Sequence, residues 1–223
     1  MKAPAEIEIP QKRGEALIQS LNWRYATKKF DPERGIKTED MDTLMEALRL
    51  SASSMGLQPY RFLRIRDAAL RKELRAASMD QAQITDAAEM IVFAAKRKYT
   101  ETDISDFLQE SQEQRGYSDE DVEKRRKSIR KHVNSFDENE FLNWTSRQLY
   151  IAVGQLLCSA ASLGIDACPM EGFKAKEYAR ILSLDSKGLQ AFAVVTLGYR
   201  LPEDALAKQA KIRLPQSKLF IEY

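Results

Sequence analysis

The sequence is poor in the side chains that most metal centres and many nucleophilic sites need. Its 223 residues include one histidine, His132, and two cysteines, Cys158 and Cys168. These are too few ligands for a zinc, haem or iron–sulfur site of the usual kind, so no metal is expected. Catalysis by a Ser-His-Asp or Cys-His arrangement would have to use His132, but the charged stretch 124–134 around it is more typical of a solvated face. The low cysteine content favours a reducing compartment and buried, apolar roles for both thiols.

The chain also lacks a large charge of either sign. Lysine and arginine total 35 and aspartate and glutamate 33, which leaves a net charge of +2. Proteins that coat nucleic acid or anionic lipid need a larger positive balance, so neither partner is expected. The one long apolar stretch, 144–163, is interrupted by Arg147 and two glutamines, which argues against a membrane span. Residues 1–10 hold two glutamates and two prolines and resemble no export signal, so the cytoplasm is the expected location.

Both glycine-rich phosphate loops are absent from the sequence, G-x-G-x-x-G as well as G-x-x-x-x-G-K-[ST]. A nucleotide would therefore have to be bound by other contacts. A chain of this length hides roughly 70% of its unfolded surface, so it needs neither a disulfide nor a metal to fold. No repeat or Gly/Ser linker divides it, and a single domain over residues 1–223 is expected.

Apolar periodicity predicts helices that alternate with strands. One helix is expected to begin with Thr38 as its cap. The stretch 144–163 is apolar on nearly every face and predicts a buried central helix, which could also pack against its twin in a dimer. Together the elements predict an α/β or α+β sandwich whose sheet is covered by helices on both sides. The expected helices are 38–50, 67–77 and 144–163, and the expected strands are 60–66, 90–95 and 190–197.

Two further regions have distinctive compositions. The stretch 96–140 is dense in charge and predicts a helical excursion or lid, with a disordered or purely solvated segment as the open alternative. Its aromatic residues could line a substrate site. The tail 216–223 has too few neighbours of its own and is expected to be an arm that adds a strand to another subunit. The aromatic residues are Tyr99, Phe107, Tyr117 and Phe136.

Two short segments hold cations at spacings that suit a phosphate. In Arg24-Tyr-Ala-Thr-Lys28 the cations are four residues apart, which puts them on one face in a helix or a strand, and Ala26 leaves room for a ligand. In Lys211-Ile-Arg213 an extended chain would project both cations the same way and point Ile212 into the body. The four cations could hold one phosphate. With 35 basic residues in the chain, ordinary surface cations at these spacings are the alternative.

The segment 168–173, Cys-Pro-Met-Glu-Gly-Phe, could present backbone N–H groups to a planar ligand, because its proline fixes the chain and its glycine lets it turn. Glu171 could be a general acid or base, or simply a cap or an ion-pair partner. Ser53 and Ser54 could donate hydroxyls to a ring or a phosphate, or be ordinary loop residues.

Five motifs follow one another along the chain: Arg24-Tyr-Ala-Thr-Lys-Lys-Phe-Asp31, Ser53-Ser-Met-Gly-Leu-Gln-Pro59, Pro169-Met-Glu-Gly-Phe173, Leu197-Gly-Tyr199 and Lys211-Ile-Arg-Leu-Pro215. In order and spacing this set resembles the FMN-dependent nitroreductase family, over about residue 21 to the C-terminus. It is most similar to the NAD(P)H-dependent group that includes oxygen-insensitive nitroreductase and dihydropteridine reductase.

The resemblance implies an α+β fold, a three-layer α/β/α sandwich in an intertwined homodimer, with FMN at the interface. It further implies that hydride from NADH or NADPH passes through flavin N5 to nitroaromatic or quinone-type acceptors by a ping-pong mechanism. Two alternatives stay open: a flavoprotein of the same fold with other redox chemistry, such as dehalogenation or flavin cleavage, and a binding or scaffold protein without the cofactor.

The resemblance also implies roles for individual residues. Arg24, Lys211 and Arg213 would hold the FMN phosphate, and Lys28 would lie near N1 and the C2 carbonyl of the ring, where a cation stabilises the reduced anion. A backbone N–H at Glu171 or Gly172 would point to N5. The other implied cofactor contacts are Tyr25, Ala26, Pro169 and Met170, and, from the other subunit, Ser53, Ser54 and Gln58.

Three positions depart from the pattern of the group. Asp80 stands where Asn is usual, and a carboxylate beside the ring would disfavour its reduced anion unless it is paired or protonated. Gln83 stands where some members place a second ring-side lysine, so Lys28 is expected to be the only such cation. Ala26 replaces a frequent serine. These departures bear on flavin potential and substrate preference more than on the fold.

Overall fold

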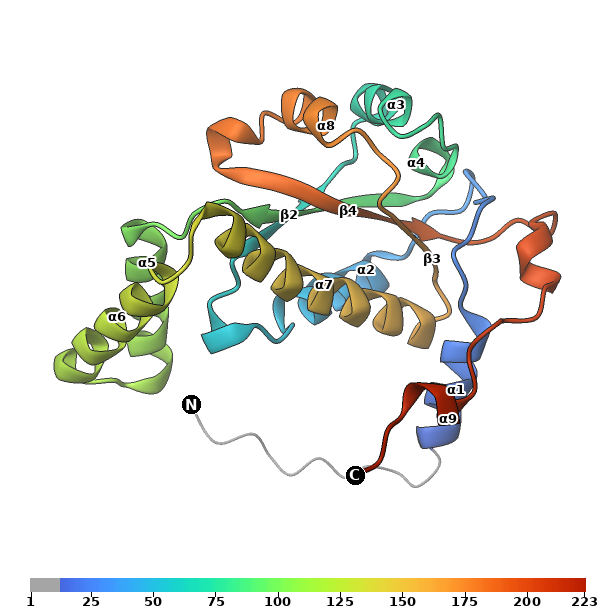
Figure 1. The fold of residues 1–223 in the computed structure, drawn as a ribbon. Coiled ribbons are helices and arrows are strands. Elements are labelled where there is room, and N and C mark those ends of the chain that lie inside the picture. The colour runs from blue at the N-terminus through green and yellow to red at the C-terminus, as the bar shows by residue number, and fades with distance from the viewer. Residues whose placement is uncertain (1–12) are drawn as a thin grey trace.

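A four-stranded antiparallel sheet forms the middle layer of the computed structural model, which describes residues 13–223 (Figure 1). The strand order is β1-β2-β4-β3, with β1 at Tyr60–Arg64, β2 at Glu89–Lys96, β3 at Asp166–Met170 and β4 at Leu189–Gly198. The three expected strands are confirmed within two residues at each end. Strand β3 was not expected, because its sequence contains Pro169. A proline is tolerated there since β3 is an edge strand, whose outward N–H groups need no partner strand.

Helices cover both faces of the sheet, as the sandwich prediction requires (Figure 1). Successive side chains of a strand point to opposite faces. In β2, Met90, Val92 and Ala94 join one core cluster, whereas Ile91, Phe93 and Ala95 join the other. The three-layer α+β architecture is thereby confirmed. One face is covered by α3 (Ala68–Ala76), α4 (Gln83–Asp86) and α8 (Ala175–Ile181), and the other by α2 (Thr38–Arg49) and α7 (Glu138–Ser162).

Helix α7 is the expected central helix but begins six residues before the predicted start. A capping box made by Asp137 and Glu140 sets this beginning, and both residues are too polar to enter an apolar pattern. The prediction of burial on nearly every face is wrong for one chain. Tyr150, Ile151 and Leu163 stay exposed, with Ile151 at 47%, so one stripe of α7 has no cover within the described chain.

Two predicted helix caps have different outcomes. Asp67 caps α3 as expected, because its carboxylate accepts a hydrogen bond from the Leu70 N–H at 2.7 Å. Thr38 does not cap α2: the N-cap residue is Lys37, and no side chain caps that end.

Of the two cysteines, Cys168 is buried as expected, whereas Cys158 is only partly buried.

The charged stretch contains α5 (Glu101–Arg115) and α6 (Asp119–Val133), a helical hairpin that projects from one end of the sheet (Figure 1). It has a small apolar core of its own, which it shares with the start of α7 through Phe141 and Trp144. His132 packs edge-on between Phe136 and Trp144, with ring centroids 5.1 Å apart in each case, so its ring is not on the solvated face that was expected. The lid role stays a prediction.

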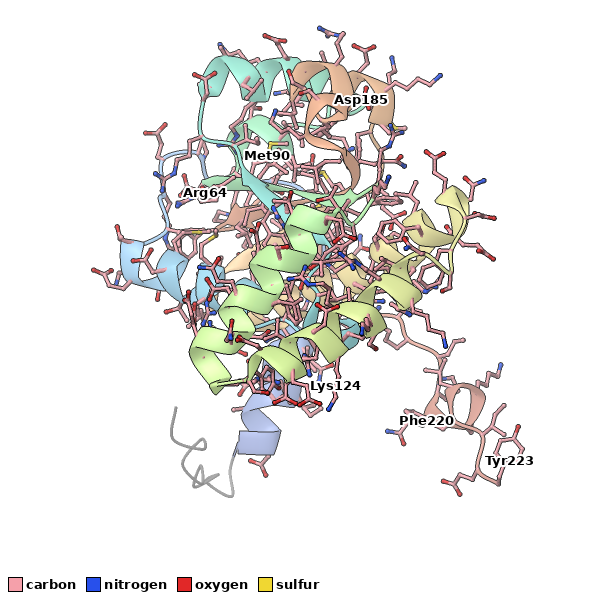
Figure 2. The ribbon with its side chains drawn as sticks, turned by 90° about the vertical axis from the view of Figure 1, so that its left-hand side faces the viewer. Arg64, Met90, Lys124, Asp185, Phe220 and Tyr223 are labelled. Atoms are coloured by element: carbon pink, nitrogen blue, oxygen red, sulfur yellow. The ribbon has the colours of Figure 1, made fainter. Side chains whose placement is uncertain are left out.

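The described chain begins with α1 (Arg13–Trp23) and ends with the 3₁₀ turn η3 (Ala205–Lys208) and α9 (Gln216–Leu219). Two further 3₁₀ turns lie within it: η1 (Ser54–Gly56) between α2 and β1, and η2 (Asp185–Lys187) between α8 and β4. Figure 2 shows the last residues, with Phe220 and Tyr223 labelled, reaching away from the body. The expected arm thus holds a short helix and no strand of its own.

Within residues 13–223, no helix combines the length and the apolar character needed to cross a membrane.

Candidate functional site

The segment after α1 is extended and lies along the outer edge of the sheet. Ala26 forms an isolated parallel bridge with Ala167 of β3, and the Thr27 N–H donates to the Ala167 carbonyl at 3.3 Å. In an extended segment, residues 24, 26 and 28 share one face. The charges of both Arg24 and Lys28 act on the buried thiol of Cys168, and the Lys28 Nζ lies 4.0 Å from its Sγ. The spacing argument for Arg24 and Lys28 therefore agrees with the geometry.

Three of the four predicted phosphate-binding cations line one cleft of about 480 Å³. They are Arg24, Lys211 and Arg213, which come from opposite ends of the chain. The Lys211 Nζ donates to the carbonyls of Leu21, at 2.6 Å, and Arg24. Burial first, and then the like charge of Arg213, lowers the pKa of Arg24. Burial, Arg24 and Arg213 likewise lower the pKa of Lys211.

No carboxylate of the described chain forms an ion pair with any of these three cations. The Arg24 Nε is buried and has no acceptor among residues 13–223. Like charges that a fold holds together without a counter-charge define an anion site.

The prediction that Ile212 points into the body is wrong: its side chain is 87% exposed, because residues 209–215 pair with no strand that would bury one face.

The site has a polar support that the sequence analysis missed. Arg200 stacks between Trp23 and Tyr25, with its Cζ 4.2 and 4.5 Å from the ring centroids. Its Nε donates to the carboxylate of Asp166, a residue only 4% exposed, at 2.7 Å. This support fixes the chain on either side of Arg24. No motif or spacing relates residues 23, 166 and 200, so only the fold reveals them.

A second carboxylate fixes the backbone under Lys28. The Asp204 Oδ2 accepts hydrogen bonds from the N–H groups of Lys28 and Lys29, at 2.7 and 3.1 Å. Burial opposes ionisation of Asp204, but these hydrogen bonds outweigh it and lower its pKa. Burial and the proximity of Asp204 raise the pKa of Tyr25 to about 12, so its phenol stays neutral near neutral pH.

The predicted ring-side residues also come together in one chain. The Gln81 Nε2 donates to the Gly172 carbonyl at 3.0 Å, which joins the loop before α4 to the end of β3. Gln83 is buried and lies beside the thiol of Cys168. Asp80 is exposed, but its carboxylate lies 2.8 Å from the Arg75 Nε. The Asp80 carboxylate is therefore paired with Arg75, and this pairing would reduce its repulsion of a negatively charged reduced flavin.

The side chain of Glu171 is held by α7. Its carboxylate accepts a hydrogen bond of 2.7 Å from the Tyr150 hydroxyl. Burial, and then this hydrogen bond, raises the pKa of Tyr150. Glu171 forms no ion pair within the described chain; the structure shows it as a hydrogen-bond acceptor, a role not among the alternatives considered, and this contact anchors the segment before Gly172.

The loop after α2 is not brought to these residues. In Figure 1 the loop and the 24–31 segment lie on opposite sides of the molecule. The Ser53 Oγ accepts from the Gln58 N–H at 2.9 Å, and the Ser54 N–H donates to Gln148 of α7 at 2.8 Å. The Gln58 amide donates to the Arg49 carbonyl at 2.7 Å. Within one chain, Ser53, Ser54 and Gln58 cannot share a ligand with Arg24.

Comparison with known proteins places this arrangement in a family. The model of the nitroreductase family matches residues 21–199, and the chain belongs to that family. A protein of Staphylococcus aureus strain USA300 that carries the name NAD(P)H nitroreductase is 34% identical over 197 residues, covering 85% of this chain and 88% of its own.

Solved structures share the fold at lower sequence identity. A nitroreductase-type protein of Bacillus subtilis has a TM-score of 0.83 at 20% identity, over 94% of this chain and 99% of its own. One from Exiguobacterium sibiricum, solved in complex with FMN, has a TM-score of 0.79 at 18% identity, over 93% of this chain and 97% of its own.

Proposed function

We propose that the protein is an FMN-dependent oxidoreductase that takes electrons from NADH or NADPH. The observation that carries the proposal is the cleft in which Arg24, Lys211 and Arg213 have no anionic partner among the described residues. A phosphate monoester carries close to two negative charges and three acceptor oxygens at neutral pH, so it fits such a cleft. Names of similar proteins support FMN and NAD(P)H as cofactor and donor.

When bound, FMN would accept a hydride from the nicotinamide and pass it to a second substrate. The chain's own residues would orient the ring. Ala167 presents its carbonyl to the outer edge of β3, and backbone groups alternate along a strand, so Pro169 faces the same edge and the next N–H groups follow where the strand ends. Proline has no N–H, which leaves the N–H of Glu171 or Gly172 as the donor toward N5. Lys28, across from this edge, would stabilise negative charge near N1 and the C2 carbonyl.

We further propose that the active form is a homodimer. One stripe of α7 is uncovered, and the arm exposes large apolar side chains, which is costly for an isolated chain. A second copy could cover both, and it could bring Ser53, Ser54 and Gln58 to the flavin site from which they are distant in one chain. The exposed apolar residues of these two surfaces include Ile151 of α7 and Leu219, Phe220, Ile221 and Tyr223 of the arm.

The proposal is tested by the visible spectrum of the purified protein and by oxidation of NADPH with a nitroaromatic or menadione as acceptor. A yellow protein that turns over either acceptor supports the proposal. Bound FMN without turnover of either acceptor would instead favour other redox chemistry, such as dehalogenation or flavin cleavage. A colourless protein that does not take up added FMN would favour a binding or scaffold role.

A further inference from the structure

A second and larger cleft, of about 690 Å³, lies between the α5–α6 hairpin and the loop Ser54–Gln58. Its long wall is one face of α5, because the lining residues recur three and four positions apart. Across from this face lie the loop and Arg61 of β1. The residues of α5 that line the cleft include Asp103, Asp106, Phe107, Glu110, Gln114 and Arg115.

Two arginines at the far end of this cleft lack a carboxylate partner. The Arg115 Nη1 donates to the Tyr117 hydroxyl at 2.9 Å, and the Arg125 Cζ lies 5.2 Å from the centroid of the same ring. Within the part of the chain that the structure describes, neither forms an ion pair, and the Arg125 Nε is buried without an acceptor. The hydrogen bond from Arg115, and then the charge of Arg125, lower the pKa of the Tyr117 phenol, which agrees with the position of both guanidinium groups beside this ring.

Other basic residues of the hairpin differ in this respect. Lys124 lies 2.8 Å from Glu120, Arg126 lies 3.5 Å from Glu123, and Arg130 lies 2.7 Å from Glu101. The two guanidinium groups that line the cleft thus differ from the other two arginines of these helices, Arg126 and Arg130, which are ion-paired. As in the phosphate cleft at Arg24, two cations lie close together and form no ion pair with a carboxylate of the described chain.

The near end of the cleft is the loop that the proposed function assigns to a flavin across the dimer interface. From Asp103 to Arg115, α5 spans about 18 Å at 1.5 Å per residue, a length comparable to an extended dinucleotide. Between the two ends, Asp106 and Glu110 offer acceptors of the kind that bind ribose hydroxyls. The order of groups along α5 therefore suits a dinucleotide whose nicotinamide lies at the loop.

We infer that this cleft binds the adenylate half of the reduced nicotinamide dinucleotide, and that Arg115 and Arg125 bind the 2′-phosphate that distinguishes NADPH from NADH. The inference rests on the proposed function. It assigns NADPH as the preferred donor and makes the two arginines specificity-determining residues. Guanidinium groups near the adenosine ribose are the usual means of accommodating this phosphate.

The test is the anaerobic reduction of the FMN-loaded protein, followed by loss of flavin absorbance at increasing concentrations of each donor. This measurement gives a Kd and a limiting rate separately for NADPH and NADH. The test variant is Arg115→Gln/Arg125→Gln. The matched control is Lys124→Gln/Lys127→Gln, which removes the same charge from residues that do not line the cleft.

The wild-type protein is expected to bind NADPH at least about tenfold more tightly than NADH, since charged hydrogen bonds to one phosphate are the difference. The test variant should raise the Kd for NADPH roughly 10- to 100-fold and leave its limiting rate and the Kd for NADH nearly unchanged. The control should keep the wild-type preference. A wild-type protein without preference for NADPH, or a test variant that weakens both donors equally, would overturn the assignment.

A third donor separates this inference from the function on which it rests. 1-Benzyl-1,4-dihydronicotinamide carries the hydride donor without any phosphate, so all variants should be reduced by it at the same rate. If it reduces the flavin while the arginine substitutions leave the NADPH Kd unchanged, the inference fails and the proposed function stands. If no donor reduces bound FMN, the proposed function itself fails.

Discussion

Removal of one uncompensated cation from the phosphate cleft should have opposite effects on the protein with and without FMN. In Arg24→Met, the apolar stem of the side chain is kept and the guanidinium is lost. Without ligand, Arg24 is half-buried near two like charges, and burial and Arg213 already lower its pKa. The substitution removes this cost, so the melting temperature of the apoprotein should stay the same or rise.

The same substitution should weaken FMN binding. A hydrogen bond to a charged group contributes about 1.5–3 kcal/mol, and each 1.4 kcal/mol is about tenfold in Kd, so the loss should be roughly 10- to 100-fold. The Kd follows from quenching of flavin fluorescence as apoprotein is added, and apoprotein stability follows from thermal unfolding without ligand. Lys29→Met serves as the control, because the exposed Lys29 side chain lies outside the cleft and Lys29 forms its hydrogen bonds through its backbone N–H and carbonyl. An apoprotein that is destabilised in proportion to the lost affinity would show that Arg24 is a structural residue.

Three further substitutions test the ring side of the site. Lys28→Ala should retain flavin and lower its midpoint potential, because a cation near N1 is lost; an unchanged potential in a dye-equilibration titration would remove Lys28 from the ring. Arg75→Ala should also lower the potential, because it frees the Asp80 carboxylate, whereas Arg75→Ala/Asp80→Asn should restore it. Asp204 has a folded pKa below its unfolded value, so its stabilising contribution is present above pH about 4 and is lost as the pH falls further. Asp204→Asn should therefore show less acid destabilisation between pH 5 and pH 3 than the wild type, as followed by circular dichroism.

The parts of the fold that could be predicted from sequence are those that neighbouring residues determine. The apolar repeat of α2, the cap at Asp67 and the continuous apolar runs of β2 and β4 each depend on residues a few positions apart. At Ile212 the prediction was wrong because a distant neighbour decided. Ile212 was expected to be buried by simple alternation, but burial of one face requires a partner strand, and residues 209–215 have none within the described chain.

The candidate site divides in the same way. Each cationic pair could be found from its own spacing, but the convergence of residues 24 and 213 could be expected only through the family resemblance. Asp166, Arg200 and Asp204 could not be predicted at all. Each acts through a contact with a residue more than thirty positions away, and an isolated acidic or basic residue in a chain that is 30% charged carries no signal of its own.

The proposed division of the site between two copies of the chain has a thermodynamic consequence. Under the proposed function, one chain holds the cations of the phosphate cleft and the N–H groups near the end of β3, so a single chain should bind FMN weakly on its own. The loop with Ser53, Ser54 and Gln58 could reach the same ligand only from a second copy, together with the apolar surface of α7 and the arm. A ligand that contacts both copies stabilises the dimer by the same free energy by which the dimer tightens the ligand. The fraction of protein with bound flavin and the fraction that is dimeric should therefore rise and fall together. The same should hold for substitutions of Ile151, which lies on the uncovered stripe of α7.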